Sequence, residues 1–251
     1  MAISFGNDYA VSSISTANTR TDALTLGSIG ANSILFVLVE AANNDYTTPI
    51  TMEYNSVPLT SLGGKQTYVG AGTNTYKELF YCVDSLTSGQ NLFIDSNVTT
   101  GLGQNGARSW IYRYWTYGGV DSLGTTKVNT TDFTTSAAEG PVSVAFNFTP
   151  TASNSTILQM LPGNSISITT TTYGSTTGTT RQGISPLTYG AASGWLAFSD
   201  YAPGSDSLYS ISQSFWPNFT TATGYGWGVE MLPAAAPPAF SSKNTQAVWI
   251  G

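Results

Sequence analysis

The stretch from Ser33 to Glu40, Ser-Ile-Leu-Phe-Val-Leu-Val-Glu, constrains the fold of this chain more than any other feature. It contains the longest uninterrupted apolar run, Ile34 to Val39, which is too short for an ordinary helix. Gly30-Ala31-Asn32 precedes it, Asn43-Asn44-Asp45 follows it, and β-branched and aromatic residues are frequent in it. These features predict a strand buried on both faces, with later strands beside it or over it.

Other short runs along the chain predict further strands. Residues 50–54 alternate apolar and polar, so Met52 and Tyr54 should share a buried face, and Asn55 with Pro58 favours a tight turn after them. In all, about ten to twelve strands are expected. The others are Val11–Ser15, Tyr76–Val83, Asn91–Asp95, Ser109–Trp115, Val142–Phe148, Ser155–Leu161, Ser165–Thr170, Trp195–Asp200, Leu208–Phe215 and Gly226–Met231.

Two segments are expected to lie outside strands. Gly63-Gly64 belongs to a glycine-rich loop, and Thr169 to Thr180, rich in Thr and Gly, has too little apolar mass to pack and is interpreted as an exposed loop or hairpin tip. No amphipathic helix pattern occurs between the strands. The sequence therefore predicts an all-β fold, a jelly-roll-like antiparallel β-sandwich.

The composition shifts only near the C-terminus. Pro233 to Pro238 contains three prolines, which cannot continue a central strand and favour a stiff, extended linker. We therefore expect a β-sandwich domain over residues 1–232 and a linker with a C-terminal arm over 233–251. The apolar end of the arm, Ala247 to Gly251, has two possible positions: it packs back on its own domain, or it docks on another subunit.

The charge content limits the partners. Only 9% of the 251 residues are charged, and a net charge of −6 is spread without Lys or Arg clusters, which argues against nucleic acid and anionic membranes as partners. The N-terminus has neither the basic start nor the apolar core of a secretory signal, and no run approaches the roughly 20 apolar residues of a membrane span. We expect a protein made in a cytoplasm.

The chain has no histidine and a single cysteine, Cys82. Ser-His-Asp and Cys-His nucleophile systems are thereby excluded, as are an internal disulfide and a Cys-cluster zinc site. Cys82 lies in an apolar run and is interpreted as a small buried side chain. No cofactor and no enzymatic activity are expected.

Carboxylates offer the remaining candidates for chemistry. A glycosidase needs two carboxyl groups roughly 5–9.5 Å apart across a cleft. The candidate pairs are Glu53 with Glu78 and Glu40 with Asp95, although strands commonly carry acidic residues on their solvent face. Oxygen ligands for Ca²⁺ could come from Asn43-Asn44-Asp45 or from Asp200 with Asp206, but turn formation explains these residues better.

Aromatic residues crowd residues 110–117 on both faces of the expected strand, which suits a strand between two sheets or one facing another subunit. One alternative is a platform on which sugars stack; the favoured one is that some rings fill the core and others line a subunit interface. The expected interface residues are Trp110, Tyr112, Tyr114, Trp115, Phe240, Val248, Trp249 and Ile250.

Several segments, in this order, resemble a jelly-roll module of bacteriophage and bacterial surface proteins. The resemblance spans about residues 30–232, and Asn55 and Ser56 stand where the family prefers glycines. The segments are Ser33–Val39, Ile50–Thr60, Glu78–Val83, Ser88–Ile94, Tyr117–Asp121 (Tyr-Gly-Gly-Val-Asp) and Trp227–Met231.

Such modules serve as attachment or decoration units on virions and have no shared catalytic site. The resemblance implies a phage virion structural protein, of the capsid decoration (cement) or head-fibre type. Its partners would be copies of itself, as a homotrimer, and the major capsid protein or another virion protein. The alternatives are a carbohydrate-binding or receptor-binding tail domain, with a glycan as partner, and a glycosidase on the same sandwich.

Overall fold

The computed structural model describes residues 2–6, 10–12, 15, 17–27, 29–30, 32–42, 50–68, 74–84, 86–96, 109–135, 142–165, 170–176, 179–189, 192–202, 209–218 and 222–235. Within these residues the chain consists of strands and their connections, with 18 strands in four sheets and no helix. Every strand pair is antiparallel. The predicted all-β fold is confirmed.

The first half of the chain forms two sheets. Its strands are β1 (Ser4–Phe5), β2 (Ala10–Val11), β3 (Thr19–Ala23), β4 (Ser33–Ala42), β5 (Thr51–Tyr54), β6 (Val57–Pro58), β7 (Thr60–Tyr68), β8 (Asn74–Asp84), β9 (Asn91–Asp95) and β10 (Ser109–Gly118). Sheet A has the order β1-β10-β4-β8-β7, with β2 also paired to β10, and sheet B has the order β3-β9-β5-β6. Together they form the first sandwich.

The second half forms two more sheets. Its strands are β11 (Val120–Thr135), β12 (Val142–Phe148), β13 (Thr156–Ser165), β14 (Thr170–Thr176), β15 (Thr179–Tyr189), β16 (Ala192–Tyr201), β17 (Tyr209–Asn218) and β18 (Ala222–Pro233). Sheet C has the order β11-β18-β13-β16-β15, and sheet D has the order β12-β17-β14. Together they form the second sandwich.

The two halves have the same strand topology. Replacing β1, β3, β4, β5, β7, β8, β9 and β10 by β11 to β18, in that order, converts sheet A into sheet C and sheet B into sheet D. Only β2 and β6 have no counterpart among the described strands. The span 1–232, for which the sequence predicts a single sandwich, therefore contains two units of one topology in tandem.

The registers of the two halves also correspond. Phe5 lies opposite Tyr117 on β10, and Leu123 lies opposite Met231 on β18. When Phe5 is matched with Leu123, their partners Tyr117 and Met231 correspond. Ile34 lies opposite Tyr117 and Thr156 lies opposite Met231, so these two residues correspond as well. The pairings across the remaining strands extend this match over both main sheets. Among the corresponding pairs are Tyr81 and Asp200, Thr60 and Thr179, Lys77 and Leu196, Glu40 and Pro162, and Arg113 and Trp227.

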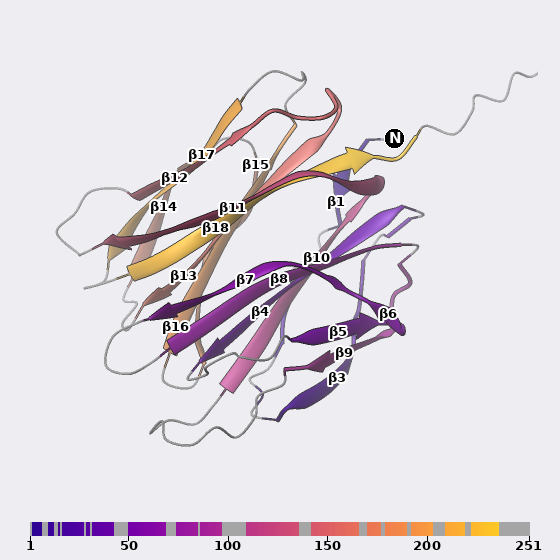
Figure 1. Ribbon diagram of the computed structural model, residues 1–251, viewed down its shortest axis with the longest axis horizontal. Helices are drawn as coiled ribbons and strands as arrows, with labels where there is room; N and C mark the ends of the chain where they lie inside the picture. The colour runs from indigo at the N-terminus through magenta and orange to yellow at the C-terminus, as the bar shows by residue number, and fades with distance from the viewer. Residues whose placement is uncertain are drawn as a thin grey trace, which may run out of the picture.

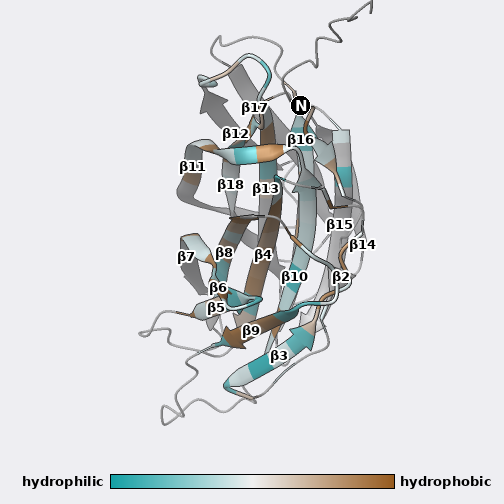
Figure 2. Cartoon of the chain, turned by 90° about the vertical axis from the view of Figure 1, so that its right-hand side faces the viewer, coloured by the Kyte–Doolittle hydropathy of each residue, from teal (hydrophilic) through white to brown (hydrophobic). Residues whose placement is uncertain are grey.

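The four sheets are stacked in the order D, C, A, B (Figure 1). Strand β4 lies in sheet A near the middle of the stack, and Figure 2 shows it as strongly hydrophobic, in contrast to the hydrophilic β3 at the edge of sheet B. Leu35 and Val37 of β4 face the core shared with sheet B, whereas Phe36 and Leu38 face the core shared with sheet C. All four are fully buried, so the prediction of a strand buried on both faces is confirmed.

The core between sheets A and B follows the alternation of apolar and polar residues in the sequence. On β5, Met52 and Tyr54 are buried and Thr51 and Glu53 are exposed, as the alternation predicts. The next two residues, Asn55 and Ser56, both have positive φ, 51° and 63°, the conformation of a type I′ hairpin turn. The predicted tight turn therefore joins β5 directly to β6.

Two predictions for loops are wrong. The sequence predicts an exposed loop or hairpin tip over Thr169 to Thr180, yet Thr170–Thr176 is β14, paired with β17, and β15 begins at Thr179. Threonine is β-branched and favours extended backbone, so a strand does not need a strongly apolar sequence. Gly63-Gly64 lies within β7, where the register shifts and Gly63 has a φ of 96°.

The two sandwiches are joined through one residue, Gly119, between β10 and β11. Its φ is 77°, and a Cβ added there would lie 2.5 Å from the carbonyl oxygen of Ala2, so only glycine fits. The carbonyl of Gly119 accepts a hydrogen bond from the backbone N–H of Ala234, just after β18. Residues 236–251, which include most of the expected linker and the arm, lie outside the described residues.

Candidate functional site at the junction of the two sandwiches

The inner faces of sheets A and C share a core, which we call the junction core. Its centre is aromatic: Trp115 of β10 stacks on Phe198 of β16, with ring centroids 4.9 Å apart, and on Phe36, at 5.7 Å. Its buried members are Ile34, Phe36, Leu38, Leu79, Trp115, Tyr117, Val120, Leu158, Met160, Leu196, Phe198, Trp227, Val229 and Met231. Because these residues come from both halves, the two sandwiches are held together by a hydrophobic core.

Three charged side chains lie on the same face of sheet A. Glu40 accepts hydrogen bonds from the ammonium of Lys77 and from Nε of Arg113, and all three residues are fully buried. Burial alone would raise the pKa of Glu40, but the attraction of Arg113 and Lys77 holds it below its ordinary value. Burial lowers the pKa of Lys77, and Glu40 offsets part of this effect. The triad is a structural ion cluster without access for a substrate.

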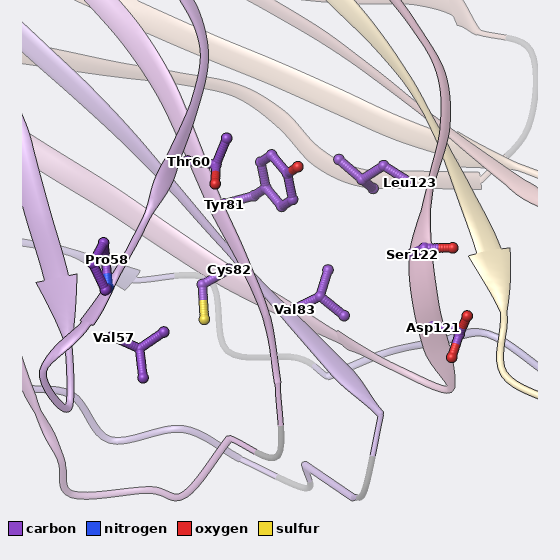
Figure 3. A pocket seen from close by; sticks show the side chains of 9 residues that line it. All are labelled: Val57, Pro58, Thr60, Tyr81, Cys82, Val83, Asp121, Ser122 and Leu123. Atoms are coloured by element: carbon purple, nitrogen blue, oxygen red, sulfur yellow. The ribbon is translucent and has the colours of Figure 1, made fainter.

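A pocket of about 400 Å³ opens at one end of the junction (Figure 3). Tyr81 and Val83 of β8 lie between the residues of β6 and β7 on one side and those of β11 on the other. The lining residues are Val57, Pro58, Thr60, Tyr81, Cys82, Val83, Asp121, Ser122 and Leu123. Cys82 is almost fully buried, and it packs in the core between sheets A and B, as predicted.

A second pocket, of about 210 Å³, lies at the other end of the junction. Asp200 of β16 accepts, at Oδ2, a hydrogen bond of 3.0 Å from the hydroxyl of Tyr117 and one of 2.6 Å from Nε of Arg181 on β15. The guanidinium of Arg181 lies 5.3 Å from the ring centroid of Phe5. The lining residues are Ile3, Tyr117, Thr156, Thr179, Arg181, Asp200, Tyr201 and Ala202.

Electrostatics reinforce this arrangement. Burial raises the pKa of the Tyr117 hydroxyl well above its ordinary value, and the neighbouring Asp200 adds to that shift. Burial works against the charge of Arg181, but the hydrogen bond and ion pair with Asp200 raise its pKa above the ordinary value. At neutral pH the Tyr117 phenol therefore stays protonated and the Arg181 guanidinium stays charged.

The two pockets are equivalent in the tandem structure. Tyr81, Cys82 and Val83 of the first correspond by register to Asp200, Tyr201 and Ala202 of the second. Thr60 corresponds to Thr179. Residues of the opposite sandwich complete each pocket: Asp121, Ser122 and Leu123 of β11 in the first, and Ile3, just before β1, with Tyr117 of β10 in the second. The correspondence of the two halves therefore gives each sandwich one pocket at the junction, at matching register positions.

The four described interface candidates lie inside the chain. Trp110 and Tyr112 pack in the core between sheets A and B, where the indole N–H of Trp110 donates to the carbonyl of Ala17 and the hydroxyl of Tyr112 donates to Asp22. Tyr114 packs in the same core and Trp115 in the junction core, and none of the four is more than 9% exposed. Their rings are covered by this chain, which leaves little surface for a sugar or a second subunit.

The other four interface candidates, in the C-terminal arm, lie outside the described residues: Phe240, Val248, Trp249 and Ile250. So do Asn43-Asn44-Asp45 and Asp206, two of the Ca²⁺ candidates. The described residues contain no group of three or more His, Cys, Asp or Glu side chains that could hold a metal ion.

The suggested carboxylate pairs do not face one another. Glu53 is exposed on the outer face of sheet B, whereas Glu78 is buried on sheet A and accepts hydrogen bonds from Ser61 and Tyr76. Burial raises the pKa of Glu78 despite these bonds. Glu40 faces the junction core, and Asp95 lies on sheet B.

Sequence reasoning considered Asp200 only as a possible Ca²⁺ ligand and missed its pairing with Arg181, the most organised polar site. Asp200 is the last residue of a predicted strand, and Arg181 follows the Thr-rich segment that was assigned to a loop. One signal was available: the chain has only eight Lys and Arg residues, so each of them invites an explanation.

The chain matches no protein-family model, and neither curated proteins nor solved structures include a significant match to it. Within the described part of the chain, no helical segment has the length and hydropathy that crossing a membrane requires.

Proposed function

We propose that this protein is a non-enzymatic structural protein of a bacteriophage virion, of the capsid decoration (cement) or head-fibre type. It acts by associating with copies of itself, as a trimer, and by docking on the major capsid protein or another virion protein. The observation that carries the proposal is the tandem sandwich with a shared, fully buried junction core.

The strand order supports this interpretation. In each half, consecutive strands or strand pairs alternate between the main sheet and the smaller sheet, as in β3, β4, β5 and then β7 with β8. We interpret this alternation as jelly-roll-like, a double-sheet architecture common in viral capsid proteins and in lectins. Since one fold hosts many functions, this argument rests on analogy of architecture.

The burial of charged side chains at the junction also supports a structural role. Although charged residues make up only 9% of the chain, Lys77, Glu40 and Arg113 are buried at the junction. The surface must then stay soluble chiefly through neutral polar groups, which suits repeated, closely packed copies on a particle. In a symmetric assembly each modest contact is used several times, and the contacts add up.

The direct test is the composition of purified virions from the phage that encodes this sequence. Quantitative mass spectrometry should find the protein in the particles, at hundreds of copies for a capsid decoration protein and at about six or twelve for a vertex or tail position. Complete absence from purified particles would refute the virion role.

A second test concerns the arm. Deleting residues 239–251 should abolish attachment to capsids or trimer formation while the remaining chain stays folded, as measured by capsid co-sedimentation and light scattering. Normal attachment and an unchanged oligomeric state would show that the arm does not dock.

The rival function, recognition of a carbohydrate or receptor, is favoured by one observation, the polar pocket at Arg181. The exposed aromatic surface first expected for it, residues 110–117, is buried.

A further inference from the structure

The pocket at Arg181 is built from parts that the fold itself does not need. Its counterpart at the other end of the junction has Tyr81 where this pocket has Asp200. It has Leu123 at the position of Phe5, whose ring packs against Arg181. Arg181 is the first residue of an irregularity in β15, and the matching irregularity in β7 begins with Leu62.

Those counterparts are apolar packing residues. Leu62, Tyr81 and Leu123 are partly buried against the junction core. At these positions the first sandwich therefore has apolar packing residues beside its pocket, while the second has an ion pair beside its own. Since burying charge costs free energy that apolar packing does not, the difference indicates a binding role.

The polar atoms are held in fixed positions before any ligand arrives. Both bonds to Asp200 end on Oδ2, so Oδ1 takes part in neither. The bond from Arg181 uses Nε, so its terminal Nη groups are the ones that can donate to a ligand. Packing over the ring of Phe5 further fixes the guanidinium.

This donor and acceptor set selects one kind of ligand. The charges of Arg181 and Asp200 compensate each other, so neither a bare anion nor a bare cation gains a net attraction. The pocket is lined by Arg181, Asp200 and Thr179, so it combines a guanidinium, a carboxylate and a hydroxyl. Sugar hydroxyls both donate and accept, so adjacent hydroxyls can use Oδ1 and Nη together.

The size of the cavity is also selective. At about 210 Å³ it is smaller than the roughly 300–1,000 Å³ typical of sites for drug-sized ligands. One sugar ring fits this volume, and a longer saccharide would have to leave it towards solvent.

We propose that the pocket formed by Arg181, Asp200, Tyr117 and Thr179 binds the terminal ring of a neutral saccharide through vicinal hydroxyls. The inference does not depend on the virion role, because a decoration protein and a free carbohydrate-binding protein can both carry such a site.

The test is NMR titration of the full-length, ¹⁵N-labelled protein with methyl glycosides of glucose, galactose, mannose, N-acetylglucosamine and fucose, and with an anionic sialic acid glycoside. We expect saturable shifts at Thr179, Arg181 and Asp200 with at least one neutral glycoside. Arg181→Leu, which restores the residue type of the other half, should weaken binding at least about 10-fold.

Asp121→Asn, in the equivalent pocket, is the matched control and should leave binding unchanged. Arg181→Gln provides a milder variant, and the spectra of both variants away from the pocket report whether they are folded. The proposal is overturned if no neutral glycoside binds, if only the sialic acid glycoside binds, if the shifts map to the Asp121 pocket, or if folded Arg181 variants bind as well as the parent.

Discussion

The two sandwiches share a topology but bury their carboxylates in opposite ways. In the first, Glu40 is neutralised by two cations, Lys77 and Arg113. In the second, Glu230 is equally buried but accepts hydrogen bonds from the backbone N–H groups of Thr125 and Thr151 and from the Thr151 hydroxyl. One topology therefore accommodates a buried charge either through ion pairing or through backbone dipoles.

The comparison extends to the positions equivalent to the triad. Leu196, Pro162 and Trp227 stand where the first sandwich has Lys77, Glu40 and Arg113, and the fold forms with either set. The triad is therefore not a requirement of the strand topology, and we expect it to fix how this particular pair of sheets docks.

The largest effect should follow the loss of Glu40. Glu40→Ala leaves two cations buried side by side, and removing one partner of a buried ion cluster costs about 3–5 kcal/mol in the free energy of unfolding. Replacing all three residues, with Lys77→Met, Glu40→Leu and Arg113→Met, should restore most of that loss, as urea unfolding can measure. A triple variant less stable than Glu40→Ala would show that the two halves are not interchangeable here.

Next in size are two leucines on opposite faces of β4. Leu35→Ala and Leu38→Ala should each cost about 2–5 kcal/mol, since both side chains are fully buried. Only Leu38 faces the junction core, so its loss should increase hydrogen exchange in β13 and β18 as well as in sheet A. Equal exchange patterns for the two variants would mean that the sandwiches are not coupled through this core.

Loss of the Glu230 carboxylate should have a smaller effect. Glu230→Gln keeps one acceptor but turns an amide NH₂ towards the donors from Thr125 and Thr151, at a cost of about 1–3 kcal/mol. The exposed Glu53 on sheet B serves as control, because Glu53→Gln should change stability by less than about 0.5 kcal/mol. Thermal unfolding of both variants tests this, and equal midpoints would contradict the structural role of Glu230.

The loss of stability at low pH should also depend on the ion cluster of the first sandwich, by a smaller amount. Because the folded-state pKa of Glu40 lies below its ordinary value of 4.5, its contribution is present above that value and is lost as the pH falls through the folded-state pKa. The triple variant should therefore lose less stability than the parent protein between about pH 5 and about pH 2, the range in which carboxyl groups ordinarily titrate. Identical pH profiles would show that the triad does not couple to protons.

The smallest expected effect lies in the β5–β6 hairpin, which has no described counterpart in the second half. Ser56 has a φ of 63°, so Ser56→Gly should relieve strain and stabilise the protein by up to about 1 kcal/mol. Chemical unfolding measures the difference. A clear loss of stability would indicate that the hydroxyl of Ser56 matters more than the backbone strain.

Local patterns predicted much of the first sandwich. The continuous apolar run of β4 identified a strand enclosed by two layers, because such a strand cannot expose either face. The aromatic residues on both faces of β10 left two possibilities, a strand between two sheets or one facing another subunit, and the structure shows the first. The alternation in residues 51–54 likewise identified β5 correctly. In these segments the burial pattern is imprinted directly on the order of residues.

Pairings between strands far apart in the sequence could not be predicted, because no local pattern of residues marks them. β11 covers Val120 to Thr135 with Gly, Thr and Asn and no clear period, and its pairing with β18 shifts register three times. The tandem relation is visible in little more than Asn32-Ser33 against Asn154-Ser155 and Ser4 against Ser122. The Arg181 pocket depends on strands that meet only after both sandwiches have formed.

The meeting point at Gly119 has a consequence for chain connectivity. Gly119 packs closely against Ala2 and accepts a hydrogen bond from Ala234, so the start of β1, the crossover and the end of β18 all lie beside this one residue. A circularly permuted gene that starts at Val120 and joins residue 235 to residue 2 through a short glycine-containing bridge should thus encode the same body. By this geometry, the fold does not require either sandwich to come first along the polypeptide.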